Sequence, residues 1–102
     1  MNPAVVVDRH SLIRTRLSQA LNGIPNVSTV YAPIDVLTST QIIIIRELIR
    51  WAEGFGLLQA ASTEFPHKQR HLHLFNTATN ESLLTKIITL ANQLQITLTF
   101  EH

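Results

Sequence analysis

Two histidines at alternate positions have the spacing best suited to a metal site in this sequence. His71 and His73 flank Leu72 in a run that predicts a strand over residues 70–75. Side chains two apart on a strand share a face, so both imidazoles would point the same way, as metal ligands do. No carboxylate follows at matching spacing, and Leu72 and Leu74 are expected to face the core. We interpret the pair as an outward-facing polar surface, keep His71 and His73 only as metal candidates, and expect no cofactor.

Motifs of known catalytic chemistry are missing from the chain. It contains no G-x-S-x-G elbow, no glycine-rich phosphate loop and no H-E-x-x-H pair, and it has no cysteine. Ser11 beside His10 has no placed acid that would complete a catalytic triad. The sequence therefore favours a non-catalytic protein, and a small enzyme with a histidine site at a subunit interface is kept as an alternative.

The basic residues are few and clustered. The chain has 8 Lys and Arg against 7 Asp and Glu, so its net charge is close to zero. A purely electrostatic nucleic-acid-binding protein is more basic than this. The candidates for contact with nucleic acid are Arg14, Arg16, Lys68 and Arg70. Their contacts would go mainly to phosphates, since no pattern of side chains here promises base readout.

Hydrophobic periodicity predicts alternating strands and helices. Strands are expected over residues 4–7, 27–31, 57–61, 70–75 and 95–101. Helices are expected over residues 10–21, 39–53 and 83–94. The order β-α-β-α-β-β-α-β predicts an α/β (α+β) fold with three helices and a mixed, mostly antiparallel sheet of about five strands. The length fits a single domain over residues 1–102.

Four consecutive isoleucines at residues 42–45 admit two interpretations. The residues that follow them favour a helix over 39–53, ended by Gly54 and Gly56. β-branched residues also favour strands, so a strand at this place is the alternative. If the segment is a central helix, Ile49 is a core residue, and its replacement by alanine should cost ~2–5 kcal/mol.

A helix followed by a hairpin with a basic tip is expected over residues 41–75, with Lys68 and Arg70 near the tip. This unit resembles the last helix and the wing of winged-helix DNA-binding regulators. The resemblance implies a helix in the major groove and wing contacts with phosphates. It departs from the family pattern where the helix opens with the apolar residues 42–45 instead of a polar face.

The first residues have a second, partial resemblance. Residues 4–31, in which an apolar run ends at Asp8, resemble the opening strand and helix of response-regulator receiver domains. In that family two adjacent acids help to hold Mg²⁺ beside a phosphorylated aspartate. Here Arg9 follows Asp8, and no later strand ends in an aspartate, so phosphorylation is not expected. No family resemblance spans the whole chain.

The last predicted strand, residues 95–101, is expected at a sheet edge that no Lys or Pro protects. Its wet face carries Thr97 and Thr99, which are the candidates for an oligomer contact. The charged fraction is only 15%, so part of the surface is expected to be covered by a protein partner or a second copy. The sequence thus favours a small protein-interaction or self-association domain, an adaptor or regulatory subunit. The alternative is a nucleic-acid-binding regulator.

Composition also suggests a cellular compartment. A chain without cysteine is typical of a cytoplasmic protein. The longest uninterrupted apolar run, residues 42–45, is far too short to cross a membrane, so no membrane contact is expected.

Overall fold

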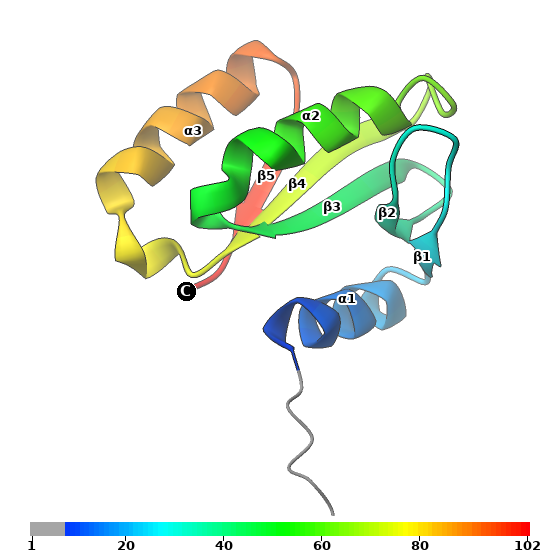
Figure 1. Cartoon of the computed structure of the whole chain (residues 1–102), viewed down its shortest axis with the longest axis horizontal. Coiled ribbons are helices and arrows are strands. Elements are labelled where there is room, and N and C mark those ends of the chain that lie inside the picture. The colour runs from blue at the N-terminus through cyan, green and yellow to red at the C-terminus, as the bar shows by residue number, and fades with distance from the viewer. Residues whose placement is uncertain (1–7) are drawn as a thin grey trace, which may run out of the picture.

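The computed structural model describes residues 8–102, which form a five-stranded sheet with helices on both faces (Figure 1). The strands are β1 (Ile24–Val27), β2 (Ile34–Leu37), β3 (Gln41–Glu47), β4 (Gln69–Phe75) and β5 (Thr97–Phe100). The helices are α1 (Arg9–Ala20), α2 (Trp51–Ala61) and α3 (Glu81–Gln93), and 3₁₀ turns occur at Leu48–Arg50 and Thr77–Thr79. The predicted α+β class, with three helices and a mixed sheet, is confirmed. None of the helices in the described part combines the length and apolar character needed to cross a membrane.

The strands lie in the sheet in the same order as in the chain, β1-β2-β3-β4-β5. The pairs β1–β2 and β2–β3 are antiparallel, whereas β3–β4 and β4–β5 are parallel. Helices α2 and α3 connect the parallel strands and lie on one face of the sheet, and α1 lies on the other (Figure 1). β5 therefore forms an outer edge of the sheet.

The isoleucines of β3 contribute to two separate cores. Ile42 and Ile44 belong to the larger core, under α2 and α3. Ile43 and Ile45 belong to a smaller core with Ile13 of α1. All four isoleucines of β3 are fully buried. An uninterrupted apolar run is typical of a strand covered on both faces, which is why residues 42–45 show no alternation.

The prediction of a helix over residues 39–53 is wrong for its first half, which forms a strand. The helix that does form begins later in the chain than predicted. Residues 41–47 form β3, and α2 begins only at Trp51. Ile49 lies in the 3₁₀ turn between them and is 72% exposed, so it is not a core residue. The strand alternative for residues 42–45 is confirmed, because burial on both faces outweighs the helical preference of the residues that follow.

The hairpin predicted from residues 57–61 and 70–75 is also wrong. Residues 57–61 form the second half of α2. β4 pairs in parallel with β3, so residues 41–75 form a strand–helix–strand crossover. The hairpin that suggested the wing of winged-helix regulators is not formed in this segment.

Two glycines expected to end a helix lie inside α2. Gly54 is buried against β4, and a Cβ atom there would lie 2.6 Å from Cδ1 of Leu72. A Cβ atom at Gly56 would meet nothing within 4 Å. Gly54 therefore allows α2 to lie close to the sheet, whereas Gly56 has no such packing role.

The remaining predictions of local structure agree more closely. α1 and α3 begin and end within two residues of the predicted helices. The Asp8 carboxylate accepts a 3.1 Å hydrogen bond from the backbone N–H of His10 and caps α1. The strand expected over residues 27–31 occurs earlier, as β1, and β2 was not predicted. The strand expected over residues 4–7 lies outside the described residues.

Candidate functional site

Both α1 arginines that are candidates for nucleic-acid contact lie beside acids. Arg14 Nη1 is 3.7 Å from Oδ1 of Asp35. Arg16 forms an ion pair with Glu101, and its side chain is 57% exposed. The charge of each arginine is therefore offset by a carboxylate before any ligand arrives.

Asp35 is the centre of a polar network that sequence reasoning missed. Its carboxylate lies 3.1 Å from Arg46 Nη1 and 3.0 Å from His10 Nε2, and it accepts a 2.7 Å hydrogen bond from the Ile45 N–H. The side chain is almost fully buried, so these partners satisfy a carboxylate that water does not reach freely. An acid inside the apolar strand Ile34–Leu37 was the sequence signal that could have identified it.

Lys68 and Arg70 lie at the start of β4, away from the α1 arginines. Lys68 Nζ donates to the backbone carbonyl of Thr38 at 2.6 Å. Arg70 donates to Gln59 of α2 at 3.0 Å and to the carbonyl of Leu94, the C-cap of α3, at 2.6 Å. Within residues 8–102, neither cation has an acidic partner within 4.0 Å. Lys68 and Arg70 thus both lie near the start of β4, but their side chains contact different segments, and neither is joined to Arg14 or Arg16.

His71 and His73 share a face as predicted, but they do not face solvent. They are 7% and 6% exposed. The Thr99 hydroxyl oxygen lies 2.6 Å from His71 Nε2 and 2.7 Å from His73 Nδ1. The outer nitrogens contact the Gln41 side-chain amide, at 2.7 Å from His71, and the Glu101 carboxylate, at 3.2 Å from His73. The prediction of an outward-facing pair is wrong because β4 lies between two strands and is covered on both faces.

The hydrogen bonds determine where the imidazole protons lie. A carboxylate only accepts, so His73 donates to Glu101 from Nε2 and accepts the Thr99 hydroxyl proton at Nδ1. The hydroxyl oxygen then accepts from Nε2 of His71. His71 Nδ1 is then left as an acceptor. This tautomer requires the Gln41 amide to be turned so that its NH₂ group takes the place of the Oε1 atom that lies 2.7 Å from Nδ1. Every group in this chain is satisfied when both histidines are neutral.

The ionisation of the three titratable groups agrees with this arrangement. Burial lowers the pKa of His71 to about 4, with a further contribution from His73. Burial also lowers the pKa of His73, and the hydrogen bond and charge of Glu101 offset only part of that effect. Burial raises the pKa of Glu101, but the hydrogen bonds from Arg16 and His73 outweigh it, and the net pKa lies below the usual value.

The metal candidates are engaged by protein groups. Both ring nitrogens of His71 and of His73 have hydrogen-bond partners in neighbouring side chains. Across residues 8–102, no group of three or more His, Cys, Asp or Glu side chains is arranged to hold a metal ion. The pair therefore acts in this structure as a polar link between β3, β4 and β5.

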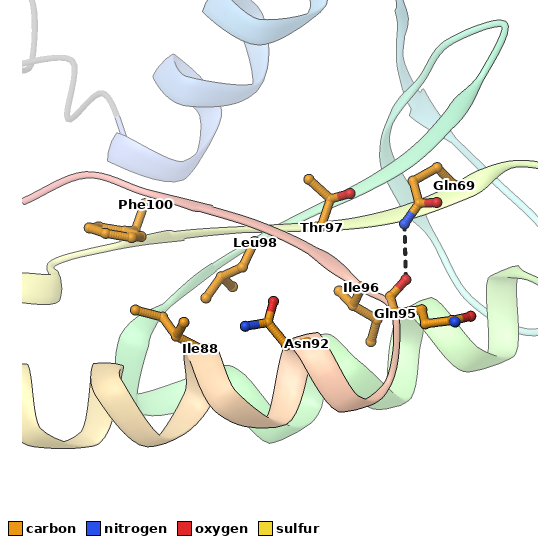
Figure 2. A pocket seen from close by; sticks show the side chains of 8 residues that line it. All are labelled: Gln69, Ile88, Asn92, Gln95, Ile96, Thr97, Leu98 and Phe100. Atoms are coloured by element: carbon orange, nitrogen blue, oxygen red, sulfur yellow. Dashed lines mark hydrogen bonds between the residues drawn. The ribbon is translucent and has the colours of Figure 1, made fainter.

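The outer edge of β5 borders an open groove of about 580 Å³. The groove is lined by residues of β5 and α3, among them Leu98, Phe100 and Ile88. Figure 2 shows Leu98 on the groove side of β5 and Thr97 on the opposite side. Phe100 is 46% exposed. Among the strands of residues 8–102, the last one lies at the edge of the sheet as predicted, while the oligomer contact through Thr97 and Thr99 stays a prediction.

These features define, over residues 8–102, a small α+β domain with β1 and β5 as the outer strands of its sheet and a buried polar network around Asp35 beneath α1. The chain is 34% identical over 80 residues to a putative KilA-N domain-containing protein of Acanthamoeba polyphaga mimivirus. It is 26% identical over 74 residues to a second putative KilA-N domain-containing protein of the same virus. The matches cover 78% and 72% of this chain, but only 32% and 21% of the two viral proteins. No family model matches the chain, and no solved structure matches it.

Proposed function

We propose that this chain is a DNA-binding module of a regulatory protein. The observation that carries the proposal is the similarity, over 78% and 72% of the chain, to two viral proteins named for a KilA-N domain. KilA-N is a DNA-binding type of domain. The similarity favours the nucleic-acid alternative over the self-association domain that the sequence alone favours.

The cations best placed for this function are those not already paired with acids. Of the 8 Lys and Arg residues, five take part in ion pairs: Arg9, Arg14, Arg16, Arg46 and Arg50. The three others are Lys68, Arg70 and Lys86. A phosphate approaching Lys68 and Arg70 has no carboxylate to displace, which supports these two as contacts with the DNA backbone.

The α1 arginines have a smaller part in the proposed interface. A phosphate that binds Arg14 or Arg16 competes with Asp35 or Glu101. Arg16 is the more accessible of the two, and Glu101→Gln would remove the negative charge that it faces. If α1 also touches DNA, this variant binds more tightly than the wild type. If α1 lies outside the interface, its affinity is nearly unchanged.

A salt titration tests the proposal. Fluorescence anisotropy with labelled double- and single-stranded DNA, at several salt concentrations, gives the affinity and its salt dependence. We expect binding at low salt that falls steeply as salt rises. Lys68→Ala with Arg70→Ala should weaken binding and reduce the salt slope by about two units, about one for each cation.

Lys86→Ala provides the matched control. Lys86 is an exposed cation of α3 without an ion-pair partner in residues 8–102, so its loss changes the net charge as Lys68→Ala does. It should leave the salt slope nearly unchanged. A wild type that binds neither probe at low salt contradicts the proposed function. Equal slopes for Lys68→Ala and Lys86→Ala contradict the assigned surface only.

Self-association remains a proposal without a relative to support it. The feature that supports self-association is the outer edge of β5, which no other strand of residues 8–102 covers, with Thr97 and Thr99 as the contact candidates. Light scattering at high protein concentration measures it directly. Thr97→Lys is the better edge variant, because Thr99→Lys would also break the hydrogen bonds of both buried histidines.

A further inference from the structure

The loop between β1 and β2, residues 28–33, presents two neighbouring large side chains to solvent. Val30 is 83% exposed and Tyr31 is 68% exposed. Single exposed apolar residues are common on protein surfaces, whereas adjoining ones more often mark a contact with another molecule. A tyrosine is well suited to such a contact, because it offers a large flat ring with a polar tip. The loop is therefore a candidate binding surface.

Hydrogen bonds hold this loop in one shape. The Thr29 hydroxyl donates to the Ala32 carbonyl. Its oxygen accepts from the Ala32 N–H at 2.9 Å and from the Tyr31 N–H at 3.3 Å. Ala32 itself is buried in the larger core and anchors the loop to the sheet. The exposure of Val30 and Tyr31 is thus built into the loop, and a ligand that contacts them has little backbone to order.

The loop also borders an open hollow of about 250 Å³, lined by its own residues 28–33. None of these lining side chains is charged. A carboxylate lies next to the loop, because Glu64 Oε1 accepts the Val30 N–H at 2.7 Å. A negative charge at this place repels a phosphate but does not oppose an uncharged ring. The loop is therefore suited to a flat, uncharged group.

A cation lies on the segment that contacts the loop. Glu64 belongs to the connection between α2 and β4, which lies beside the β1–β2 loop (Figure 1). Lys68 is at the end of this connection, and its Nζ lies 5.8 Å from the centre of the Phe65 ring. It has no acidic partner within 4.0 Å in the part of the chain that the structure describes, as noted above. An uncharged hollow and a cation on neighbouring segments match the two parts of a nucleotide, its base and its phosphate.

We propose that Tyr31 stacks on an unpaired base of the DNA, with Lys68 at a phosphate of the same strand. This inference rests on the proposed function and specifies the form of DNA that the site takes, a single-stranded region. Bases stacked in a duplex present only their edges in the grooves, so their faces are not accessible to Tyr31. Every base has a flat face, so the contact adds affinity with little dependence on sequence.

Fluorescence anisotropy with a labelled single-stranded oligonucleotide tests the contact. Tyr31→Ala should bind about ten-fold more weakly than the wild type at every salt concentration. Its salt slope should be unchanged, because no phosphate contact is lost. Tyr31→Phe keeps the ring and should bind nearly as well as the wild type.

Ile49→Ala is the matched control for the loss of an exposed side chain. Ile49 is 72% exposed and precedes α2, whereas the β1–β2 loop contacts the chain after the end of α2. This variant should bind the single strand as the wild type does.

Tyrosine emission gives a second measurement. The chain has one tyrosine, Tyr31, and one tryptophan, Trp51. In Trp51→Phe, which keeps an aromatic ring beside Phe55, the emission comes from Tyr31. Unlabelled single-stranded DNA should quench it, since the ring stacks on a base. An oligomer of abasic sites, which has phosphates but no bases, should leave the emission unchanged.

The outcomes separate this inference from the proposed function. A wild type that binds no DNA contradicts both. A wild type that binds only the duplex, or a Tyr31→Ala variant that binds the single strand as well as the wild type, overturns this inference alone. Unchanged DNA binding together with an altered oligomeric state of Tyr31→Ala in light scattering also overturns it, and identifies the loop as a protein contact.

Discussion

His71 and His73 are linked through a single hydroxyl, that of Thr99, which lies 2.6 Å from one ring and 2.7 Å from the other. The hydroxyl has one proton, so it donates to His73 and accepts from His71. A proton added to His73 Nδ1 would meet a donor instead of an acceptor. This arrangement of the link between β4 and β5 is the one formed by two neutral rings.

This link predicts a loss of stability in mild acid. The pKa of His71 is lowered from 6.5 to about 4, so between these pH values the unfolded chain binds a proton that the folded chain does not. The contribution is fully present above pH 6.5 and is lost as the pH falls toward 4. For His71 the expected loss is about 3 kcal/mol, and urea unfolding at several pH values across this range would measure it.

Two histidine variants check the source of that pH dependence. His71→Gln should lower the free energy of unfolding at pH 7 and flatten its dependence between pH 6.5 and 4. His67→Asn removes an exposed histidine and should leave the dependence unchanged. If wild type and His71→Gln lose stability in parallel, the buried histidine is not the cause.

Asp35→Asn should strongly destabilise the protein. The change removes a buried negative charge that offsets Arg46 and Arg14, and leaves those cations beneath α1 without it. Breaking such a buried pair costs about 3 kcal/mol or more. Glu53→Gln is the control, because Glu53 is exposed and pairs with Arg50, and with the outer side of Arg46, at the surface, so its loss should cost much less than the loss of Asp35. Comparable losses for the two variants in thermal or urea unfolding would contradict the role given to Asp35.

The two glycines of α2 should respond to alanine in opposite ways. Gly56→Ala adds a methyl group in open space and should stabilise the helix by about 0.5–1 kcal/mol. Gly54→Ala places the same group against the fully buried Leu72, and the resulting overpacking should destabilise by about 1–2 kcal/mol. Melting temperatures of the two variants that shift in the same direction would refute the close packing of α2 on β4.

Isoleucine truncations distinguish the strand from the helix first expected in the middle of the chain. Ile44→Ala removes a fully buried side chain from the larger core and should cost ~2–5 kcal/mol. Ile49→Ala, at a side chain 72% exposed, should change stability by about 0.5 kcal/mol or less. If equilibrium unfolding showed a larger loss of stability for Ile49→Ala than for Ile44→Ala, Ile49 would be a core residue and the strand assignment would be contradicted.

The success of the sequence-based predictions depended on how each element is buried. α3 is amphipathic and buries a single stripe that includes Leu84 and Ile87, so its period is visible in the sequence. β3 is buried on both faces, so its period-two alternation disappears and the run of isoleucines fits a helix equally well. A helix predicted over residues 39–53 and ended by Gly54 and Gly56 makes a strand the natural prediction for residues 57–61, and the incorrect hairpin follows from it.

The functional residues were harder to predict because their roles depend on partners distant in sequence. Arg16 meets Glu101 and His71 meets Thr99 only because the fold places β5 beside β4 and below α1. Spacing along a strand could show that His71 and His73 share a face, but it could not show that a neighbouring strand and a helix cover that face. Asp35 was visible as an acid in an apolar run, yet its cationic partners come from two other elements.

The order of strands in the sheet, which is also their order in the chain, has a consequence for how the protein is assembled. Each strand pairs with the one that precedes it, so the sheet can grow by one strand at a time as the polypeptide leaves the ribosome. No pairing between described strands has to wait for a segment from the opposite end of the chain, which keeps the entropy cost of loop closure small at each step. Among the described strands, β5 is the last to be made, and it joins a sheet in which its partner β4 is already paired with β3.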